Sequence, residues 1–173
     1  REDDIRYFRE VIQPYWKGKS LEDVLKREYG KEIDKIAKVV KINQQDHAQG
    51  HICPDCTLWL QKGPEGLRLE AKRRMDGADD EKKIFYQSVQ IVMEGVSHFM
   101  LRYAQEMRRM EQEEKDGRCR EEMEAVAGNC ERLAKHPAGS FHEAVQSIWF
   151  LMVVLHMESN ASSFSPGRLD RIL

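Results

Sequence analysis

Apolar residues recur at helical spacing along most of this 173-residue chain. Over residues 2–16 they fall three or four positions apart, which is the spacing of one face of an amphipathic helix. These apolar positions are Ile5, Phe8, Val11, Ile12 and Tyr15. Pro14 and Gly18 are stop signals for a helix. A first helix is therefore predicted for residues 2–16.

Two shorter helices are predicted next. Ser20 and Asp23 approximate a capping box, and Gly30 is expected to end the helix that they begin. A further helix is predicted over residues 31–42. Its inward face would consist of Ile33, Ile36, Ala37, Val39 and Val40.

Residues 43–56 interrupt the apolar pattern. The stretch is polar and rich in side chains that both donate and accept hydrogen bonds. We expect a loop here, and loops carry functional residues more often than the elements they join. After it, a turn of helix at residues 58–62 and a separate helix at residues 64–75 are predicted, because Pro64 suits a first helical position.

The clearest helix is predicted over residues 80–116, where apolar residues alternate in steps of four and three. Such spacing gives a long helix with a narrow apolar seam. The seam would contain Phe85, Val89, Val92, Val96, Phe99, Tyr103, Met107 and Met110. Gly117 separates it from a helix with Met123, Val126, Cys130 and Leu133 on its inner face. Because strand signals are weak, the chain is predicted to be mainly α-helical.

The last helix, at residues 141–157, is capped by Ser140 and Glu143 and is strongly apolar. It ends in a cluster of hydroxyl and amide side chains, namely Ser159, Asn160, Ser162, Ser163 and Ser165. Helix capping explains one or two of these residues but not five. Neutral hydroxyls at the end of an apolar helix suit a substrate with hydroxyl or carboxylate groups. Arg168 and Asp170 follow, either as an ion pair or as an anion site.

Composition narrows the function classes. The net charge of −2 gives no overall field that would favour nucleic acid or an anionic membrane. The longest apolar run, residues 148–155, is too short to span a bilayer. The first residues carry no apolar signal segment, so a cytoplasmic location with four reduced cysteines is expected.

Cys53 and Cys56 have the spacing of a zinc or redox pair. Zinc would require a second pair of ligands. His47 and His51 could complete a Cys/His set, but the resulting site would be compact for tetrahedral geometry. A redox motif would be expected within a βαβ pattern, which the sequence lacks. A helical interaction module that binds metal through these cysteines and histidines therefore remains an alternative, but no metal site is predicted.

Four segments, in order along the chain, resemble the glycyl radical enzymes, the superfamily of pyruvate formate-lyase and the diol dehydratases. Residues 15–21 resemble "YWKGKT", and residues 49–52 with Asp55 resemble "GH(I/T)xxD". Residues 140–150 resemble "TFHEALQSFWF", and residues 158–170 resemble "ESNGxSxSPGRxDQ". The phrases look like the dehydratase and lyase branch, and a formate C-acetyltransferase-like enzyme fits them less well.

This resemblance implies a fold and a chemistry. Residues 1–173 would be a single partial domain, the helical N-terminal portion of a ten-stranded α/β barrel. The complete enzyme would be a cytoplasmic homodimer acting on a small hydroxylated or carboxylated molecule. An activating enzyme that uses S-adenosylmethionine would install a radical on a glycine in the C-terminal part. His51 and Ser163 would contact the substrate, with Asn43 a weaker candidate.

The chain departs from the family phrases at several positions. Ala161 and Ser162 stand where many relatives have glycine and histidine, which argues against a diol as the substrate. Cys56 replaces a common aromatic residue, and Arg171 replaces glutamine. No cysteine matches the thiyl position, so no catalytic residue is predicted within the chain. Alone, residues 1–173 are expected to be inert and to expose sticky apolar faces, above all on the helix at residues 141–157.

Overall fold

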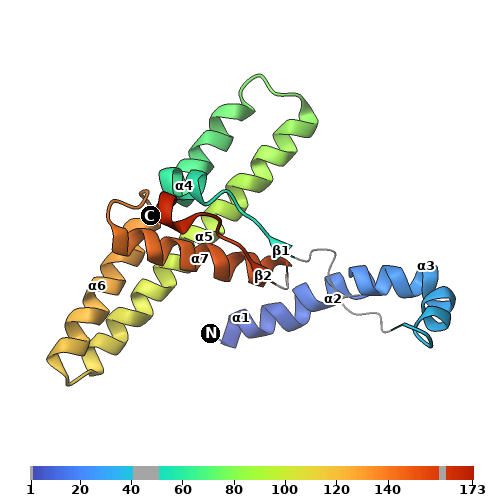
Figure 1. Cartoon of the computed structure of the whole chain (residues 1–173), viewed down its shortest axis with the longest axis horizontal. Coiled ribbons are helices and arrows are strands. Elements are labelled where there is room, and N and C mark those ends of the chain that lie inside the picture. The colour runs from blue at the N-terminus through green and yellow to red at the C-terminus, as the bar shows by residue number, and fades with distance from the viewer. Residues whose placement is uncertain (1, 41–50, 160–162) are drawn as a thin grey trace. The chain divides into compact units, whose positions relative to one another are not determined.

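The computed structural model describes residues 2–40, 51–159 and 163–173. Helices dominate these ranges, which confirms the mainly α prediction (Figure 1). The chain divides into two compact units. One contains Arg1–Ile52 and Ser159–Ser163, and the other contains Cys53–Glu158 and Phe164–Leu173. That residues 1–173 form part of a single domain stays a prediction.

The first unit begins with one helical run, as predicted for residues 2–16. It consists of α1 (Glu2–Tyr7), the π-helical segment η1 (Phe8–Ile12) and α2 (Gln13–Trp16). The π-helical segment ends two residues before Pro14, whose ring and missing N–H disfavour a regular α-helical hydrogen bond. At this point the Gln13 N–H donates to the carbonyl of Phe8, five positions earlier.

Helix α3 (Leu21–Ile36) starts at the predicted cap, where Ser20 Oγ accepts a 3.1 Å hydrogen bond from the Asp23 N–H. It then continues through Gly30, so the predicted end at Gly30 and the separate helix over residues 31–42 are wrong. Glycine in a helix costs only about 1 kcal/mol relative to alanine. The apolar spacing of Leu25, Tyr29, Ile33 and Ile36 runs across it unbroken.

None of the residues in helices α1 to α3 is buried. The predicted inward face of the first helix is open, with Phe8 53% and Tyr15 59% exposed. The periodicity therefore identified an amphipathic helix correctly. Its apolar face has no covering layer among the described residues of its own unit.

The second unit is built from two helical hairpins and a crossing helix (Figure 1). Helix α4 (Cys56–Met75) packs along α5 (Asp80–Glu113), which packs in turn along α6 (Gly117–Leu133). Helix α7 (Phe141–Ser159) follows, and the short α8 (Leu169–Ile172) ends the chain.

The division of α4 at Gly63 and Pro64 confirms the predicted break. Gly63 adopts φ +61°, which is left-handed backbone that favours glycine. A Cβ at this position would also approach the His136 carbonyl oxygen to 3.2 Å. Two independent constraints therefore require glycine at the kink.

The long helix α5 confirms the prediction of a single element, but its predicted seam is only partly right. The buried stripe is Val96, Met100 and Ala104, four residues apart. Phe85 and Val92, which were assigned to the seam, are 62% and 50% exposed. The predicted seam runs along the whole helix, whereas α4 and α6 pack against different parts of α5.

The core of the second unit gathers side chains from α4, α5, α6 and α7. Its members include Trp59, Met100, Leu133, Ile148 and Phe150.

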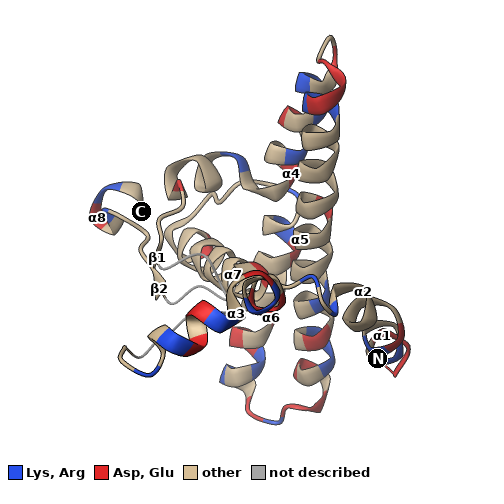
Figure 2. Ribbon diagram, turned by 90° about the vertical axis from the view of Figure 1, so that its right-hand side faces the viewer, with Lys and Arg blue, Asp and Glu red and all other residues tan. Residues whose placement is uncertain are grey.

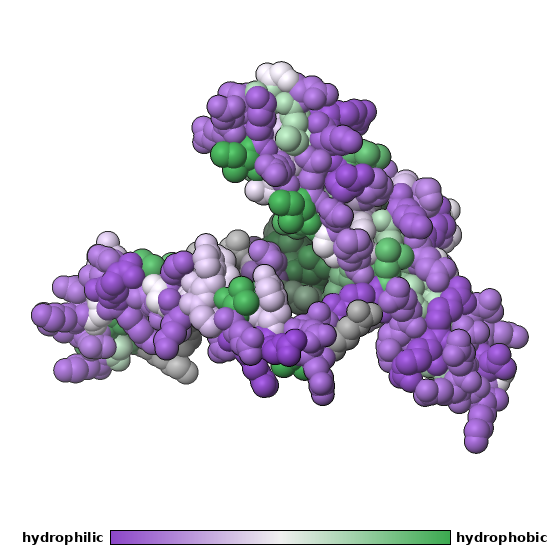
Figure 3. Space-filling model, turned by 180° about the vertical axis from the view of Figure 1, so that it is seen from behind, coloured by the Kyte–Doolittle hydropathy of each residue, from purple (hydrophilic) through white to green (hydrophobic). Residues whose placement is uncertain are grey.

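Acidic and basic residues alternate along the outer faces of the hairpins (Figure 2), and hydrophilic residues cover most of the face in Figure 3. In the described ranges no helix combines the length and apolarity that a membrane crossing requires.

Candidate functional site

Two short strands bring together residues that lie far apart in the sequence. Strand β1 (His51–Ile52) follows the predicted loop, and β2 (Ser163–Phe164) follows the predicted hydroxyl cluster. They pair in a two-stranded sheet. His51 and Ser163 therefore lie on neighbouring strands within the same compact unit.

The Ser163 hydroxyl is buried and has no hydrogen-bond partner among the described residues. A buried hydroxyl without a partner costs about 1–3 kcal/mol, so native proteins nearly always satisfy such groups. Ser97 Oγ is in the same state, but it lies in the interior of α5, where a serine hydroxyl can turn toward its own helix backbone. Ser163 lies on a strand and lacks that option.

The neighbouring residue anchors β2. The Phe164 ring packs against the apolar core and lies 6.5 Å from the His156 ring of α7, measured between centroids. Successive side chains of a strand point to opposite faces. The Ser163 side chain is therefore expected on the opposite face of β2 from the Phe164 ring.

His51 is exposed, so its imidazole is accessible for hydrogen bonding. Asn43, the weaker candidate, lies outside the described residues, as do Asn160 and Ser162 of the hydroxyl cluster. Of the predicted substrate contacts, the structure thus brings His51 and Ser163 together. Their role in binding stays a prediction.

Arg168 and Asp170 form an ion pair, which was one of the two predicted alternatives. Arg168 donates through Nε at 2.8 Å and through Nη2 at 2.5 Å to the two carboxylate oxygens. This bidentate contact lowers the pKa of the Asp170 carboxyl. The Arg168 guanidinium is therefore engaged by its neighbour, which disfavours the predicted anion site.

Cys53 and Cys56 differ in environment. Cys53 is exposed, whereas Cys56 begins α4 inside the apolar core and is 3% exposed. Burial raises the pKa of the Cys56 thiol, and the Asp55 carboxylate raises it further. Asp55 itself caps α4 by accepting a 2.9 Å bond from the Leu58 N–H. A neutral core thiol is a poor metal ligand or redox group.

The metal-binding alternative gains no support from the rest of the chain that the structure describes. Within residues 2–40, 51–159 and 163–173, no three His, Cys, Asp or Glu side chains cluster with the geometry of a metal site. His47, which belonged to the predicted ligand set, lies outside these ranges.

The start of α7 is fixed by a buried carboxylate. Glu143 accepts from Arg132 Nε at 2.5 Å, from Arg132 Nη2 at 2.7 Å and from the Gly139 N–H at 2.6 Å. The Arg132 guanidinium is the main cause of the Glu143 pKa, which falls to about 2. Ser140 Oγ accepts from the Glu143 N–H at 3.2 Å, which confirms the predicted cap. The part played by Arg132 was missed, because the sequence gives no local signal for it.

The middle of α7 is joined to α4 by a buried polar contact. The Trp59 indole N–H donates to Ser147 Oγ at 2.8 Å and to the Ser147 carbonyl oxygen at 3.1 Å. Trp59 is 5% and Ser147 2% exposed. A buried indole N–H needs such a partner, so this pair fixes both the distance and the rotation of the two helices.

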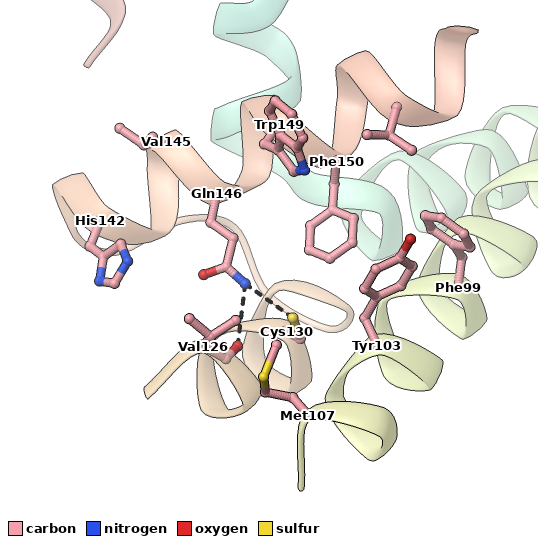
Figure 4. Close-up of a pocket in the computed structure, with 11 residues that line it drawn as sticks. Phe99, Tyr103, Met107, Val126, Cys130, His142, Val145, Gln146, Trp149 and Phe150 are labelled. Atoms are coloured by element: carbon pink, nitrogen blue, oxygen red, sulfur yellow. Dashed lines mark hydrogen bonds between the residues drawn. The ribbon is translucent and has the colours of Figure 1, made fainter. Parts of the chain in front are cut away.

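An apolar groove of about 380 Å³ lies beside α7 (Figure 4). Phe99, Tyr103 and Phe150 pack edge to face in it, with ring centroids 4.9–6.1 Å apart. The Gln146 amide nitrogen donates to the Val126 carbonyl and to Cys130 Sγ. The groove has no charged lining residue.

Comparison with known proteins decides the family. Residues 1–173 match the family described as PFL-like, pyruvate formate lyase-like. The chain belongs to this family. The predicted resemblance to glycyl radical enzymes is confirmed, because a solved glycyl radical enzyme of Archaeoglobus fulgidus has a TM-score of 0.70 at 28% identity, covering 92% of this chain and 21% of that one.

This PFL-like chain is similar to two curated dehydratases and to a dehydratase of known structure. An Escherichia coli K12 protein named "Probable dehydratase YbiW" is 30% identical over 99% of the chain. The (2S)-3-sulfopropanediol dehydratase of Klebsiella oxytoca is 28% identical over 100% of it. In each case the chain spans 22% of the relative's length. The glycerol-bound B12-independent glycerol dehydratase of Clostridium butyricum has a TM-score of 0.79 at 25% identity, covering 99% of this chain and 23% of that one.

Proposed function

We propose that this PFL-like chain is part of a glycyl radical lyase that acts on a small hydroxylated or carboxylated substrate. The reaction would be a dehydration, a decarboxylation or the cleavage of another carbon–heteroatom bond. The β1–β2 pair would form one wall of the substrate pocket. The observation that carries this proposal is the buried Ser163 hydroxyl, which has no partner among the described residues and lies on the strand paired with that of His51.

The two side chains suit such a substrate. A neutral imidazole and a hydroxyl each donate and accept hydrogen bonds, so together they can orient a hydroxyl or carboxylate group without adding charge. The imidazole can also assist the departure of a leaving group by proton transfer. We assign His51 and Ser163 to substrate binding, with Asn43 as an additional contact from the residues before β1.

The radical chemistry would come from elsewhere in a longer polypeptide. The chain spans 22% of its curated relatives, and its four cysteines do not match the family's thiyl position. We propose that an activating enzyme using S-adenosylmethionine installs a glycyl radical outside residues 1–173. The complete enzyme would work in the cytoplasm as a homodimer, without nucleic acid or membrane partners.

The test compares the whole polypeptide that the gene encodes with residues 1–173 alone. After anaerobic incubation with the activating enzyme and S-adenosylmethionine, the whole polypeptide should give a glycyl doublet in electron paramagnetic resonance. Residues 1–173 should give none. A doublet from the short chain would refute the assignment of the radical site.

The pocket assignment has its own test. In the activated polypeptide, Ser163→Ala and His51→Ala should each raise KM for the turned-over substrate by about tenfold or more, the effect of one lost hydrogen bond to a substrate. Ser88→Ala, which removes an exposed hydroxyl on α5 outside the hydroxyl cluster, is the matched control and should leave KM unchanged. Equal effects from all three variants would contradict the role of Ser163.

A further inference from the structure

A cavity of about 580 Å³ lies where α8 meets the first turns of α4 and the loop before α7 (Figure 1). Every residue that lines it belongs to the second compact unit, and none of them belongs to β1 or β2. The cavity has a polar wall and an apolar wall. The polar side chains are Thr57, Gln61, Ser140 and Arg171, and the apolar ones include Leu60 and Ile172.

The cavity contains a cationic side chain and no acidic one. Among the side chains that line it, Arg171 is the one that carries a charge. No ion pair of Arg171 is found among the described residues. Its sequence neighbour Asp170 is bound by Arg168 at 2.8 and 2.5 Å. An anion from outside can therefore bind the Arg171 guanidinium, which has five N–H donors, without displacing an ion pair.

Three neutral side chains add hydrogen-bond donors to the polar wall. Ser140 Oγ accepts from the Glu143 N–H at 3.2 Å, so its own O–H remains available as a donor. The side chains of Thr57 and Gln61 are exposed and form no hydrogen bond within the part of the chain that the structure describes. Hydroxyl and amide donors beside a guanidinium are a donor set that suits a carboxylate.

The walls of the cavity are fixed by contacts outside it. Arg132 Nη2 donates to the Pro137 carbonyl at 2.8 Å, and the Gly139 N–H donates to Glu143 at 2.6 Å. These bonds hold the loop between α6 and α7. Ile172 packs against the apolar core and so anchors α8. Walls that are ordered before binding reduce the entropy lost when a ligand binds.

We propose that this cavity binds a small organic anion, with a carboxylate at Arg171 and a short hydrocarbon part against Leu60 and Ile172. Its volume lies in the range of small-molecule sites, and its mixed lining selects for a charged group joined to an apolar one. Arg171 stands where the family phrase has glutamine, which donates hydrogen bonds but adds no charge. The preference for an anion is therefore a property of this chain. It goes beyond the proposed lyase activity and involves no radical.

The test uses the whole polypeptide that the gene encodes, without activation, and butyrate as the probe. With ¹³C-labelled isoleucine methyl groups and constant ionic strength, the Ile172 signal should shift saturably in nuclear magnetic resonance, with a millimolar Kd. The Ile148 methyl, which lies in the core and does not line the cavity, should not shift. 1-Butanol has a similar size and no charge, so it should bind at least about tenfold more weakly.

Arg171→Gln should weaken butyrate binding at least about tenfold, because it removes the charge-assisted hydrogen bonds. Thr57→Val keeps the shape of the side chain but loses the hydroxyl, and should weaken binding about threefold. Arg120→Gln is the matched control, because it removes an exposed arginine from α6 and gives the same net charge. It should bind butyrate as the wild type does.

Equal affinity of the wild type and Arg171→Gln for butyrate would overturn the proposal. Equal binding of butyrate and 1-butanol would do the same, as would an Ile172 signal that butyrate does not shift. The glycyl doublet and the kinetic test of Ser163 depend on none of these results, so the anion site and the proposed function can fail separately.

Discussion

Helices α6 and α7 have similar lengths but differ in the polarity of their surfaces. Seven of the 17 residues in α6 are charged, against two of the 19 in α7. Charged residues of α6 form ion pairs within the helix and with Arg108 of α5, and such pairs suit a surface in contact with water. The side of α7 that faces away from the core carries exposed apolar residues instead, among them Phe141 at 67% and Trp149 at 61% exposure.

The contrast indicates that the outer faces of the two helices suit different surroundings, water for α6 and packed polypeptide for α7. A helix that is apolar on all sides is typical of the interior of a large protein. Because the chain spans 22% of the length of its curated relatives, we expect other polypeptide to cover the outer face of α7 in the proposed lyase. The charged outer face of α6 suits contact with water and does not require such a cover.

The largest effect is expected on the buried face of α7. Phe150 is 4% exposed and packs edge to face on Phe99 and Tyr103. Phe150→Ala should lower the free energy of unfolding by about 3–5 kcal/mol, because it leaves a cavity in the core. Trp149→Ala, one position away and exposed, should cost less than about 1 kcal/mol. Denaturant unfolding measures both, and similar losses would contradict the two-faced description of α7.

The partly buried ion pair at the start of α7, in which the Glu143 side chain is 11% and the Arg132 side chain 40% exposed, should come second. Glu143→Gln weakens the contacts to Arg132 and Gly139 and should cost about 2 kcal/mol, the range for hydrogen bonds to a charged group. The folded-state pKa of Glu143, about 2, lies below its ordinary value of 4.5. Its contribution is therefore fully present above about pH 5 and is lost as the pH falls toward 2.

A pH series of unfolding experiments checks this sign. The difference in unfolding free energy between wild type and Glu143→Gln should shrink as the pH falls from 5 to 2. The same difference should stay constant between pH 6 and 8. A difference that grows on acidification would show that Glu143 is not held as a carboxylate.

A smaller effect is expected for the ion pairs on the outer hairpin. Arg108 lies 3.4 Å from Glu131 and 3.5 Å from Glu111, and these two glutamate side chains are 49% and 20% exposed, against 11% for Glu143. Arg108→Ala should cost less than about 1 kcal/mol, and added salt should reduce the loss further. A cost equal to that of Glu143→Gln would contradict the distinction between the two kinds of ion pair.

The outer face of α7 should affect association more than stability. Trp149→Lys should change the free energy of unfolding by no more than about 0.5 kcal/mol, as is usual for an exposed position. It should nevertheless reduce binding of an apolar dye and self-association measured by light scattering. Gln105→Lys adds the same charge to an exposed site on α5 and should leave both signals unchanged.

Sequence periodicity located the helices because their apolar faces repeat over several turns. It also located the kink in α4, because Gly63 and Pro64 act on local backbone geometry. It failed at Gly30, where the continuing apolar spacing outweighs a modest local preference. It failed as well along α5, where the partner helix changes and the buried stripe shifts to Val96, Met100 and Ala104.

The candidate site was predictable only in part. Strands of two residues carry no periodic signal, so the pairing of β1 with β2 could not be read from the pattern. The family resemblance named His51 and Ser163 without giving their geometry. The bonds of Arg132 to Glu143 and of Trp59 to Ser147 join residues 11 and 88 positions apart, which a local reading of the sequence does not reveal.

The central feature of the proposed lyase is a substrate pocket shared by the side chains of His51 and Ser163. A crystal structure of the whole encoded polypeptide soaked with glycerol, as a hydroxylated probe, tests it most directly. Both the imidazole and the Ser163 hydroxyl should lie about 2.7–3.2 Å from oxygen atoms of one glycerol molecule. Glycerol bound elsewhere, with the two side chains facing different cavities, would contradict a shared substrate pocket.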